Sequence, residues 1–337
     1  MSEAKETILT LKGVETHFPI KKGVFKRTAG HVKAVDGISL EVYRGETLAL
    51  VGESGCGKTT LGKSILQLVK PTAGEIIYND KRSERDLCKL SQKEMMEVNR
   101  KLQIVFQDPQ SSLNPAFTVF GSLQDPLKTH GVKSKADRRK IIGDLLESVN
   151  MRRDQMDLYP HEFSGGQRQR IGIARALSIE PDLIVCDEAV SALDVSIQAQ
   201  VLKLLKEIKK ERNLTYVFIT HDLSVVEYIS DRVAVMYLGK VVELADVEDL
   251  YASTMHPYTK ALLSAIPVAD LDKKSKRVIL EGDVPSPVDP PAGCSFHPRC
   301  RQCQQICKTE EPPLKRFETN GNEHFSACHF AEQQLEM

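Results

Sequence analysis

The hydrophobic positions of the chain form short runs, and between these runs apolar residues recur at helical spacing. Runs of four or five residues, mostly aliphatic or β-branched, have the length of strands that are buried on both faces. Their alternation with helical segments predicts a mostly parallel β-sheet flanked by helices. The predicted strands are Thr47–Val51, Leu102–Phe106, Leu183–Cys186 and Tyr216–Thr220.

Two further segments have the pattern of hairpin strands. They are Gly37–Val42 and Asp231–Val242, and the second contains a turn at Leu238–Lys240. Hairpin strands pair antiparallel, so we expect an antiparallel lobe beside the parallel sheet.

A helical insertion is predicted between Asn114 and His161, where Lys, Arg and Leu recur at helical spacing, most clearly in Arg138–Val149. After about Asp246 the periodicity weakens, and five prolines interrupt regular structure. These prolines are Pro285, Pro287, Pro290, Pro291 and Pro298. The pattern thus predicts a large α/β unit followed by a small C-terminal module.

Composition and charge narrow the class of protein. Hydrophobic residues (41%) and charged residues (27%) fall in the range of folded globular chains. The 46 basic residues equal the 46 acidic ones, so no bulk field favours nucleic acid or an anionic membrane. The first residues lack the apolar core of a secretory signal, and no run of about 18 apolar residues predicts a membrane span. We therefore expect a cytosolic protein.

The strand Thr47–Val51 leads into a glycine-rich turn that fits G-x-x-x-x-G-K-[ST], and helix-compatible residues follow. Glycines let backbone N–H groups curl around a phosphate, Lys58 reaches the β and γ phosphates, and Thr59 ligates Mg²⁺. The sequence therefore predicts a nucleoside triphosphate site. Its residues are Gly52, Ser54, Gly55, Cys56, Gly57, Lys58, Thr59 and Thr60.

The strand Leu183–Cys186 ends in two carboxylates, Asp187 and Glu188. Beside a phosphate loop, the first carboxylate is expected to hold Mg²⁺ and the second to polarise the water that attacks the γ phosphate. Solvated acids at the end of a strand are common by themselves, so this interpretation depends on the phosphate loop.

The string Phe163–Arg170, FSGGQRQR, resembles the LSGGQ signature of the ABC ATPases. Ser164, Gly165 and Gly166 offer a hydroxyl and backbone N–H groups at a helix N-terminus, which is a second anion site. The resemblance implies head-to-tail dimers in which this signature, Gln167 included, covers the γ phosphate held by the other subunit. A phosphate-transferring kinase, by contrast, leaves the string unexplained.

Other residues match the ABC ATPases in the same order. Gln107 resembles the glutamine that contacts Mg²⁺ and senses the membrane subunit, and Asp194 the acid that lies across the dimer interface. His221 resembles the histidine that bonds the γ phosphate and positions the water. Phe18 occupies the place of an aromatic residue that stacks on adenine, although a loop from Pro19 to His31 is expected next. Phe25 is an alternative stacking residue, and a buried core position is an alternative for Phe18.

Further segments resemble the oligopeptide/dipeptide importer ATPases, in particular the F-type member of their paired subunits. They are His17–Ile20, Gly30–Gly37, Phe106–Pro115 and Asp194–Gln200. The resemblance implies two membrane permease subunits, a paralogous second ATPase and an external solute-binding protein. It also implies a peripheral location at the cytoplasmic face of the membrane. Nickel or another small solute is the alternative cargo.

A soluble ABC ATPase acting on DNA or ribosomes is a rival hypothesis from another class. Such proteins usually carry two cassettes or long coiled coils, and this chain shows one cassette and no sustained heptads. We therefore expect no nucleic-acid partner.

The tail strengthens the resemblance to the importer ATPases. His256–Thr259 with Leu262–Leu263 matches the family's H-P-Y-T-x-x-L-L element, and Gly293–Cys300 its G-C-x-F-x-x-R-C motif. Four cysteines match those with which some members hold a [4Fe–4S] cluster. They are Cys294, Cys300, Cys307 and Cys328.

The ligand at these cysteines stays open. Their spacing suits zinc equally well, Cys303 is a competing ligand, and free thiols or disulfides are further alternatives.

The resemblance implies an α/β P-loop ATPase domain over residues 1–250, with a helical subdomain at about 114–165. A Cys-rich C-terminal extension over residues 251–337 completes the expected organisation. Bound ATP and Mg²⁺ are the expected cofactors.

Overall fold

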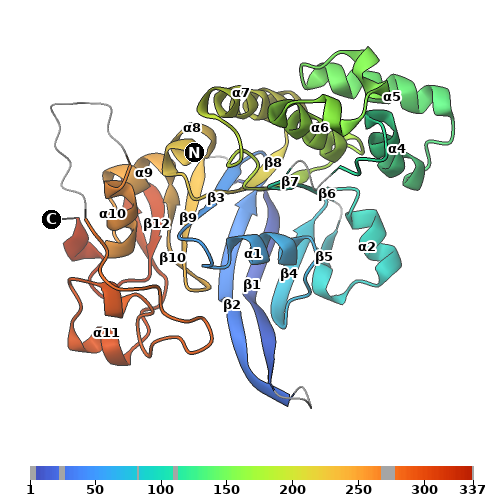
Figure 1. The fold of residues 1–337 in the computed structure, drawn as a ribbon. Coiled ribbons are helices and arrows are strands. Elements are labelled where there is room, and N and C mark those ends of the chain that lie inside the picture. Colours follow the sequence, from blue (N-terminus) through green and yellow to red (C-terminus); the bar gives the residue numbers. More distant parts are fainter. Residues whose placement is uncertain (1–4, 23–26, 82, 109–112, 267–277, 336–337) are drawn as a thin grey trace, which may run out of the picture. The chain divides into compact units, whose positions relative to one another are not determined.

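The computed structural model describes residues 5–22, 27–81, 83–108, 113–266 and 278–335. The chain divides into two compact units. The first comprises the described residues of 1–6, 43–46 and 89–219, and the second those of 7–42, 47–88 and 220–337. Each unit has its own sheet strands and helices (Figure 1).

The first unit is built on three parallel strands in the order β6–β7–β8. Leu102 of β6 lies opposite Leu183 of β7, which lies opposite Thr215 of β8. The strands and helices of this unit are β6 Leu102–Val105, β7 Leu183–Asp187, β8 Thr215–Ile219, α2 Gln92–Val98, α4 Val119–Thr129, α5 Lys135–Ser148, α6 Gly165–Leu177 and α7 Val195–Arg212. The predicted parallel strands of this unit are confirmed to within one residue at each end.

Continuous apolar sequence explains why these strands are interior. All five residues of β7 and all five of β8 are buried. Helix α7 buries one stripe, Val201, Leu202, Leu204, Leu205 and Ile208, at the spacing of a helix that packs on a sheet. Asn213 ends this helix in a left-handed conformation with φ +50°, which suits a short polar side chain.

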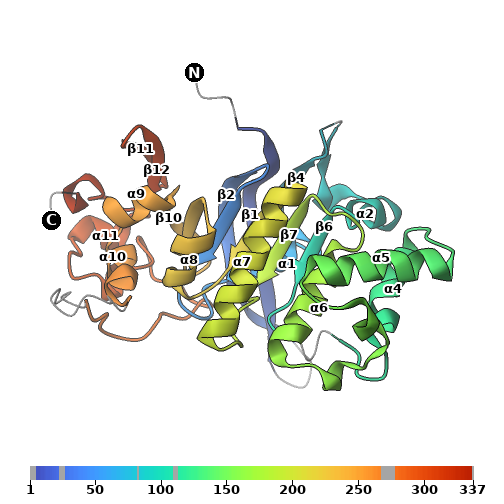
Figure 2. The same ribbon diagram turned by 90° about the horizontal axis from the view of Figure 1, so that it is seen from above.

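The helices α4, α5 and α6 pack against one another, and Figure 2 shows them grouped in green. Ser134 caps α5 by accepting the backbone N–H of Asp137, and Thr118 caps α4 in the same way. Two short 3₁₀ helices, Arg153–Asp157 and Pro160–Glu162, connect this group to α6. The helical insertion predicted between Asn114 and His161 is confirmed.

The second unit contains a four-stranded sheet in the order β2–β1–β4–β5. Leu9 of β1 lies opposite Tyr78 of β4 in an antiparallel pair. These strands are β1 Thr7–Lys22, β2 Arg27–Tyr43, β4 Ala73–Asn79 and β5 Glu84–Asp86. They form the predicted antiparallel lobe, with Ile8, Leu9, Leu11 and Val14 buried on β1.

A second group of strands in this unit has the order β3–β9–β10–β12–β11. The β3–β9 pair is parallel, and β9, β10, β12 and β11 then pair antiparallel in turn. The strands and helices are β3 Thr47–Val51, β9 Arg232–Tyr237, β10 Lys240–Asp246, β11 Lys315–Thr319, β12 Asn322–Ser326, α1 Lys58–Ile65, α8 Leu223–Ile229, α9 Val247–Ala252, α10 Pro257–Ser264 and α11 Gln305–Thr309. The predicted hairpin with its turn at Leu238–Lys240 is confirmed.

Two expectations differ from the structure. The loop predicted from Pro19 to His31 is wrong, because β1 continues to Lys22 and β2 starts at Arg27. Pro19 lies beyond the last residue of β1 that pairs with β4, Glu15, and a strand tolerates a missing N–H where one side is unpaired.

The tail also has more regular structure than its prolines suggested. Strands β11 and β12 join β10, so the tail extends a sheet of the second unit.

Within the described part of the chain, no helix combines the length and the apolar character needed to cross a bilayer.

The carboxylate of Glu243 joins β10 to β12 and to the turn before α10. It accepts hydrogen bonds from the backbone N–H groups of Met255 (2.6 Å) and His256 (3.1 Å), and lies 2.8 Å from Nε2 of His324. Glu243 and His324 are both fully buried.

We expect Glu243→Ala to lower the stability of the fold by roughly 3–5 kcal/mol, because it leaves buried partners unsatisfied. The thermal unfolding midpoint should fall by roughly 5–10 °C. Glu323→Ala, an exposed acid on β12 paired with Arg316, is the matched control. A midpoint that falls no further than in the control contradicts this role of Glu243.

Candidate functional site

The phosphate loop lies between β3 and α1 in the second unit. Lys58, the first residue of α1, is 5% exposed, and its ammonium donates to the carbonyls of Gly52 (2.7 Å) and Glu53 (3.0 Å). Ser54 and Gly55 are exposed, Cys56 is buried, and Thr59 and Thr60 are partly buried. The structure therefore brings the predicted loop residues together around the start of one helix.

Two positions of the loop require glycine. Gly57 has φ +105°, and a Cβ there would lie 2.0 Å from the carbonyl oxygen of Ala34. Gly52 has φ +146°, and a Cβ there would lie 2.2 Å from the carbonyl oxygen of Met236. The loop is thus held against backbone on both sides, so a side chain at either position has no room.

His221 belongs to the same unit as the phosphate loop. It is exposed and immediately precedes Asp222, which caps α8 by accepting the N–H of Ser224 (2.9 Å). The preceding residue, Thr220, donates its N–H to the carbonyl of Leu50 on β3 (3.2 Å). His221 therefore follows a residue tied to the strand that enters the phosphate loop.

The carboxylates of the acidic strand lie in the first unit. Asp187 ends β7 and is 5% exposed. Glu188 follows with φ +46°, and its N–H donates to the carbonyl of Ile219 (3.0 Å). The amide of Gln107 donates to Oε2 of Glu188 at 2.8 Å, so the structure brings these two predicted residues together.

The signature string forms the start of α6. Ser164 accepts the N–H of Gln167 (3.3 Å), and the side chain of Gln167 accepts the N–H of Ser164 (3.0 Å), which is a capping box. Ser164 and Gly165 are exposed, whereas Gly166 is buried. A Cβ at Gly166 would lie 2.4 Å from a methyl of Ile197, so this glycine lets α6 approach α7 closely.

Asp194 caps α7. One carboxylate oxygen accepts the hydroxyl of Ser196 (2.7 Å) and the N–H of Ile197 (3.0 Å). These hydrogen bonds, the Ser196 hydroxyl first, hold the pKa of Asp194 below its usual value. The predicted interface acid thus has a structural task in its own subunit.

Phe18 lies on β1 and is 41% exposed, so it is not a core residue. Its neighbour His17 lies 3.0 Å from the carboxylate of Asp36. The alternative stacking residue, Phe25, lies outside the described residues, as do residues 109–112 of the Phe106–Pro115 segment.

Four of the predicted cysteine ligands line one small apolar cavity of about 20 Å³ in the second unit. They are Cys294, Cys300, Cys307 and Cys328. Burial raises the pKa of Cys294 to about 12 and that of Cys328 to about 11. Cys303 does not line the cavity, and its thiol donates to the carbonyl of Gln304 (3.5 Å). All eight cysteines of the chain are free thiols, which excludes the disulfide alternative for this structure.

The expected [4Fe–4S] or zinc site is not supported by this arrangement. Among the residues that the structure describes, no three His, Cys, Asp or Glu side chains are grouped so that they could hold a metal ion. The four thiols therefore share a cavity without forming a ligand group.

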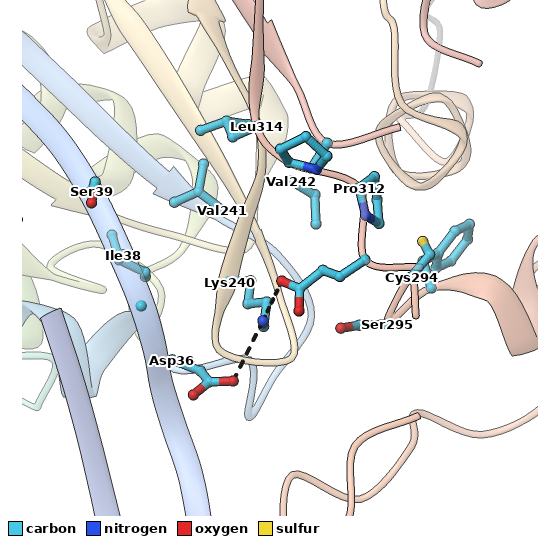
Figure 3. A pocket seen from close by; sticks show the side chains of 15 residues that line it. Asp36, Ile38, Ser39, Lys240, Val241, Val242, Cys294, Ser295, Pro312 and Leu314 are labelled. Atoms are coloured by element: carbon cyan, nitrogen blue, oxygen red, sulfur yellow. Dashed lines mark hydrogen bonds and ion pairs between the residues drawn. The ribbon is translucent and has the colours of Figure 1, made fainter. Parts of the chain in front are cut away.

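A larger cavity, of about 380 Å³, lies beside β2 and β10 (Figure 3). The ammonium of Lys240 lies 3.6 Å from the carboxylate of Asp36 and also pairs with Glu311. Of the predicted site residues, Cys294 alone lines this cavity.

Sequence reasoning missed Glu53, a residue of the phosphate loop itself, and two residues of the same unit that contact it, Tyr258 and Arg299. Glu53 forms two hydrogen bonds with the guanidinium of Arg299 (2.6 and 3.1 Å), and its N–H donates to the hydroxyl of Tyr258 (2.8 Å). Tyr258 belongs to the first tail motif and Arg299 to the second, and the sequence predicted no role for either residue. Burial lowers the pKa of His256 to about 3, so its neutral ring accepts the N–H of Tyr258.

Two protein families match parts of this chain. The family described as ABC transporter matches residues 35–191, and the oligopeptide/dipeptide transporter C-terminal region matches residues 242–307. An oligopeptide transport ATP-binding protein of Bacillus subtilis, AppF, is 50% identical over 96% of this chain and 98% of its own. A putative peptide import ATP-binding protein of Brucella ovis is 48% identical over 95% of this chain and 97% of its own.

A solved dimeric structure of the ATP-binding cassette MJ0796, bound to ADP and phosphate, is also similar. It is 29% identical, has a TM-score of 0.62, and covers 71% of this chain and 99% of its own. The fold and the site thus define an ATP-binding cassette, the ATP-hydrolysing subunit of an ABC transporter. Within that class, the chain belongs to the family of oligopeptide transport ATP-binding proteins.

Gly57→Ala should raise the Kd of Mg-ATP at least about tenfold, a loss of about 1.4 kcal/mol of binding free energy. The reason is that the new Cβ would meet the Ala34 carbonyl at a strained φ. Equilibrium titration of the full chain measures this effect. Gly172→Ala is the control, since a Cβ at that position on α6 has nothing within 4 Å. An unchanged Kd for Gly57→Ala contradicts the assigned loop.

Proposed function

We propose that this ATPase subunit powers the import of peptides across the cytoplasmic membrane. The supporting observation is the identity of 48–50%, over nearly the whole chain, to proteins named for oligopeptide transport and peptide import. The match to the oligopeptide/dipeptide transporter C-terminal region supports the same cargo class. Nickel or another small solute is the alternative.

The nucleotide is bound by the phosphate loop. Its backbone N–H groups and the ammonium of Lys58 neutralise the phosphates, and the N-terminus of α1 adds its dipole. Thr59, Gln107 and Asp187 would hold Mg²⁺, which supplies charge neutralisation at the β and γ phosphates when bound. Phe18, exposed on β1, stacks on the adenine.

Hydrolysis is carried by Glu188. Its carboxylate accepts a hydrogen bond from the attacking water and takes the proton as the water oxygen bonds to the γ phosphorus and the bridging oxygen leaves with ADP. The amide of Gln107, 2.8 Å away, holds the carboxylate, and the hydrogen bond from the Glu188 N–H to the carbonyl of Ile219 holds its backbone. His221 donates to the γ phosphate and positions the same water.

Two subunits close over each nucleotide in a head-to-tail dimer. The exposed Ser164 and Gly165, at the N-terminus of the 13-residue α6, present N–H groups to the γ phosphate bound by the other subunit. Gly166, Gln167 and Asp194 hold this surface in shape. The second ATPase is a paralogue, and the pair docks on two permease subunits at the cytoplasmic face, which receive peptide from an external binding protein.

Glu188→Gln should bind Mg-ATP with unchanged affinity and lower kcat for ATP about 10²–10⁴-fold, because the base is lost while its shape is kept. Peptide uptake by the assembled transporter in vesicles should fall in parallel. Glu211→Gln, an exposed acid near the end of α7, is the control. Near-normal hydrolysis by Glu188→Gln contradicts the role of Glu188, and uptake of nickel in place of peptide contradicts the proposed cargo.

A further inference from the structure

Glu53 is an acid inside a loop that binds an anion, and it is held on three sides. Its N–H donates to the hydroxyl of Tyr258 (2.8 Å), and its carbonyl accepts from the ammonium of Lys58 (3.0 Å). Its carboxylate accepts two hydrogen bonds from Arg299, at 2.6 and 3.1 Å. Tyr258 and Lys58 therefore hold the backbone of Glu53, and Arg299 holds its side chain.

Tyr258 is rigid where it meets Glu53. It is fully buried near the start of α10, and its N–H donates to Nδ1 of His256 (3.1 Å). The N–H of His256 in turn donates to the buried carboxylate of Glu243 (3.1 Å). A chain of hydrogen bonds thus connects β10 to the phosphate loop through Tyr258.

Arg299 is equally fixed. Its side chain is 6% exposed, whereas that of Glu53 is 28% exposed. Phe296, three residues earlier, packs its ring on Tyr237 (5.3 Å between centroids) and on Tyr258 (5.4 Å). Because these rings are buried, the segment that carries Arg299 cannot shift without moving the residues that hold Glu53.

We propose that Arg299 and Tyr258 are positioning residues for nucleotide binding, a pair that we name the Glu53 clamp. The proposal rests on the proposed role of the phosphate loop as the ATP site. Arg299 neutralises the Glu53 carboxylate beside the phosphates and fixes its direction, and Tyr258 fixes the Glu53 peptide. The affinity of the loop for nucleotide therefore depends on the C-terminal tail.

The negative charge of Glu53 allows a test that separates the clamp from a purely structural contact. Without Arg299, the Glu53 carboxylate would repel the triphosphate, since like charges at short range in a partly buried site interact strongly. Removing that carboxylate as well should then restore binding in part. A merely structural role of Arg299 predicts no such rescue.

The test measures Mg-ATP binding to the full chain, KM and kcat in the assembled transporter, and the unfolding midpoint. Arg299→Ala should raise Kd and KM about tenfold, with kcat within about twofold. The reason is that the loop is displaced and the Glu53 carboxylate is no longer neutralised. Arg299→Ala combined with Glu53→Gln should recover at least about threefold of the lost affinity. Arg301→Ala is the matched control, since Arg301 is exposed and pairs with Glu281.

Two milder variants keep the test decisive where Arg299→Ala fails to fold. Arg299→Lys keeps the charge and should bind ATP better than Arg299→Ala but worse than the unmodified chain. Tyr258→Phe keeps the ring and removes the acceptor of the Glu53 N–H, and should raise Kd a few-fold. Normal ATP binding by all the variants overturns the clamp alone, whereas an unmodified chain that does not bind ATP overturns both the clamp and the proposed site.

Discussion

The structure depends on how closely the phosphate loop passes to neighbouring backbone. Gly57 lies against the carbonyl of Ala34 and Gly52 against that of Met236, at distances that exclude any side chain. This approach lets β3, buried along its whole length, lead into a loop in which Ser54 and Gly55 are exposed. It also places the carbonyls of Gly52 and Glu53 within reach of Lys58. Backbone packing at the two glycines thus fixes the position of this loop and of Lys58 within the second unit.

In the first unit, the ends of parallel strands position the predicted site residues. Its parallel strands bury apolar side chains on both faces and leave polar residues where the strands end, at Gln107 and Glu188. Parallel strands place their carboxyl ends on one edge, which is where α/β proteins form their sites. At that edge, the hydrogen bond from the Glu188 N–H to Ile219 holds the backbone of Glu188 at a positive φ, and the amide of Gln107 holds its carboxylate. The strained backbone conformation thus lies at Glu188, the residue that we propose as the catalytic base.

The sequence predicted the elements that bury apolar runs and missed those whose stability comes from pairing. Strand β3 and the strands of the first unit were predicted to within a residue, because their continuous apolar sequence can only be interior. Strands β11 and β12 were not predicted, because their sequences, KRFET and NEHFS, are polar. Their stability comes from pairing with each other and, for β12, with β10. Arg299 and Glu53 are 246 residues apart, so no local pattern could show their contact.

The tail's two sequence motifs are accounted for by one physical role. His256 and Tyr258 of the first motif, and Phe296 and Arg299 of the second, form a buried aromatic and hydrogen-bonded cluster with Glu243 and Tyr237. A cluster with so many buried polar groups is stable only when every partner is in place. Its outermost members are the Arg299 guanidinium and the Tyr258 hydroxyl, and both end on Glu53. Phe296 also lines the thiol cavity, so one continuous set of packed and hydrogen-bonded residues lies between that cavity and the phosphate loop.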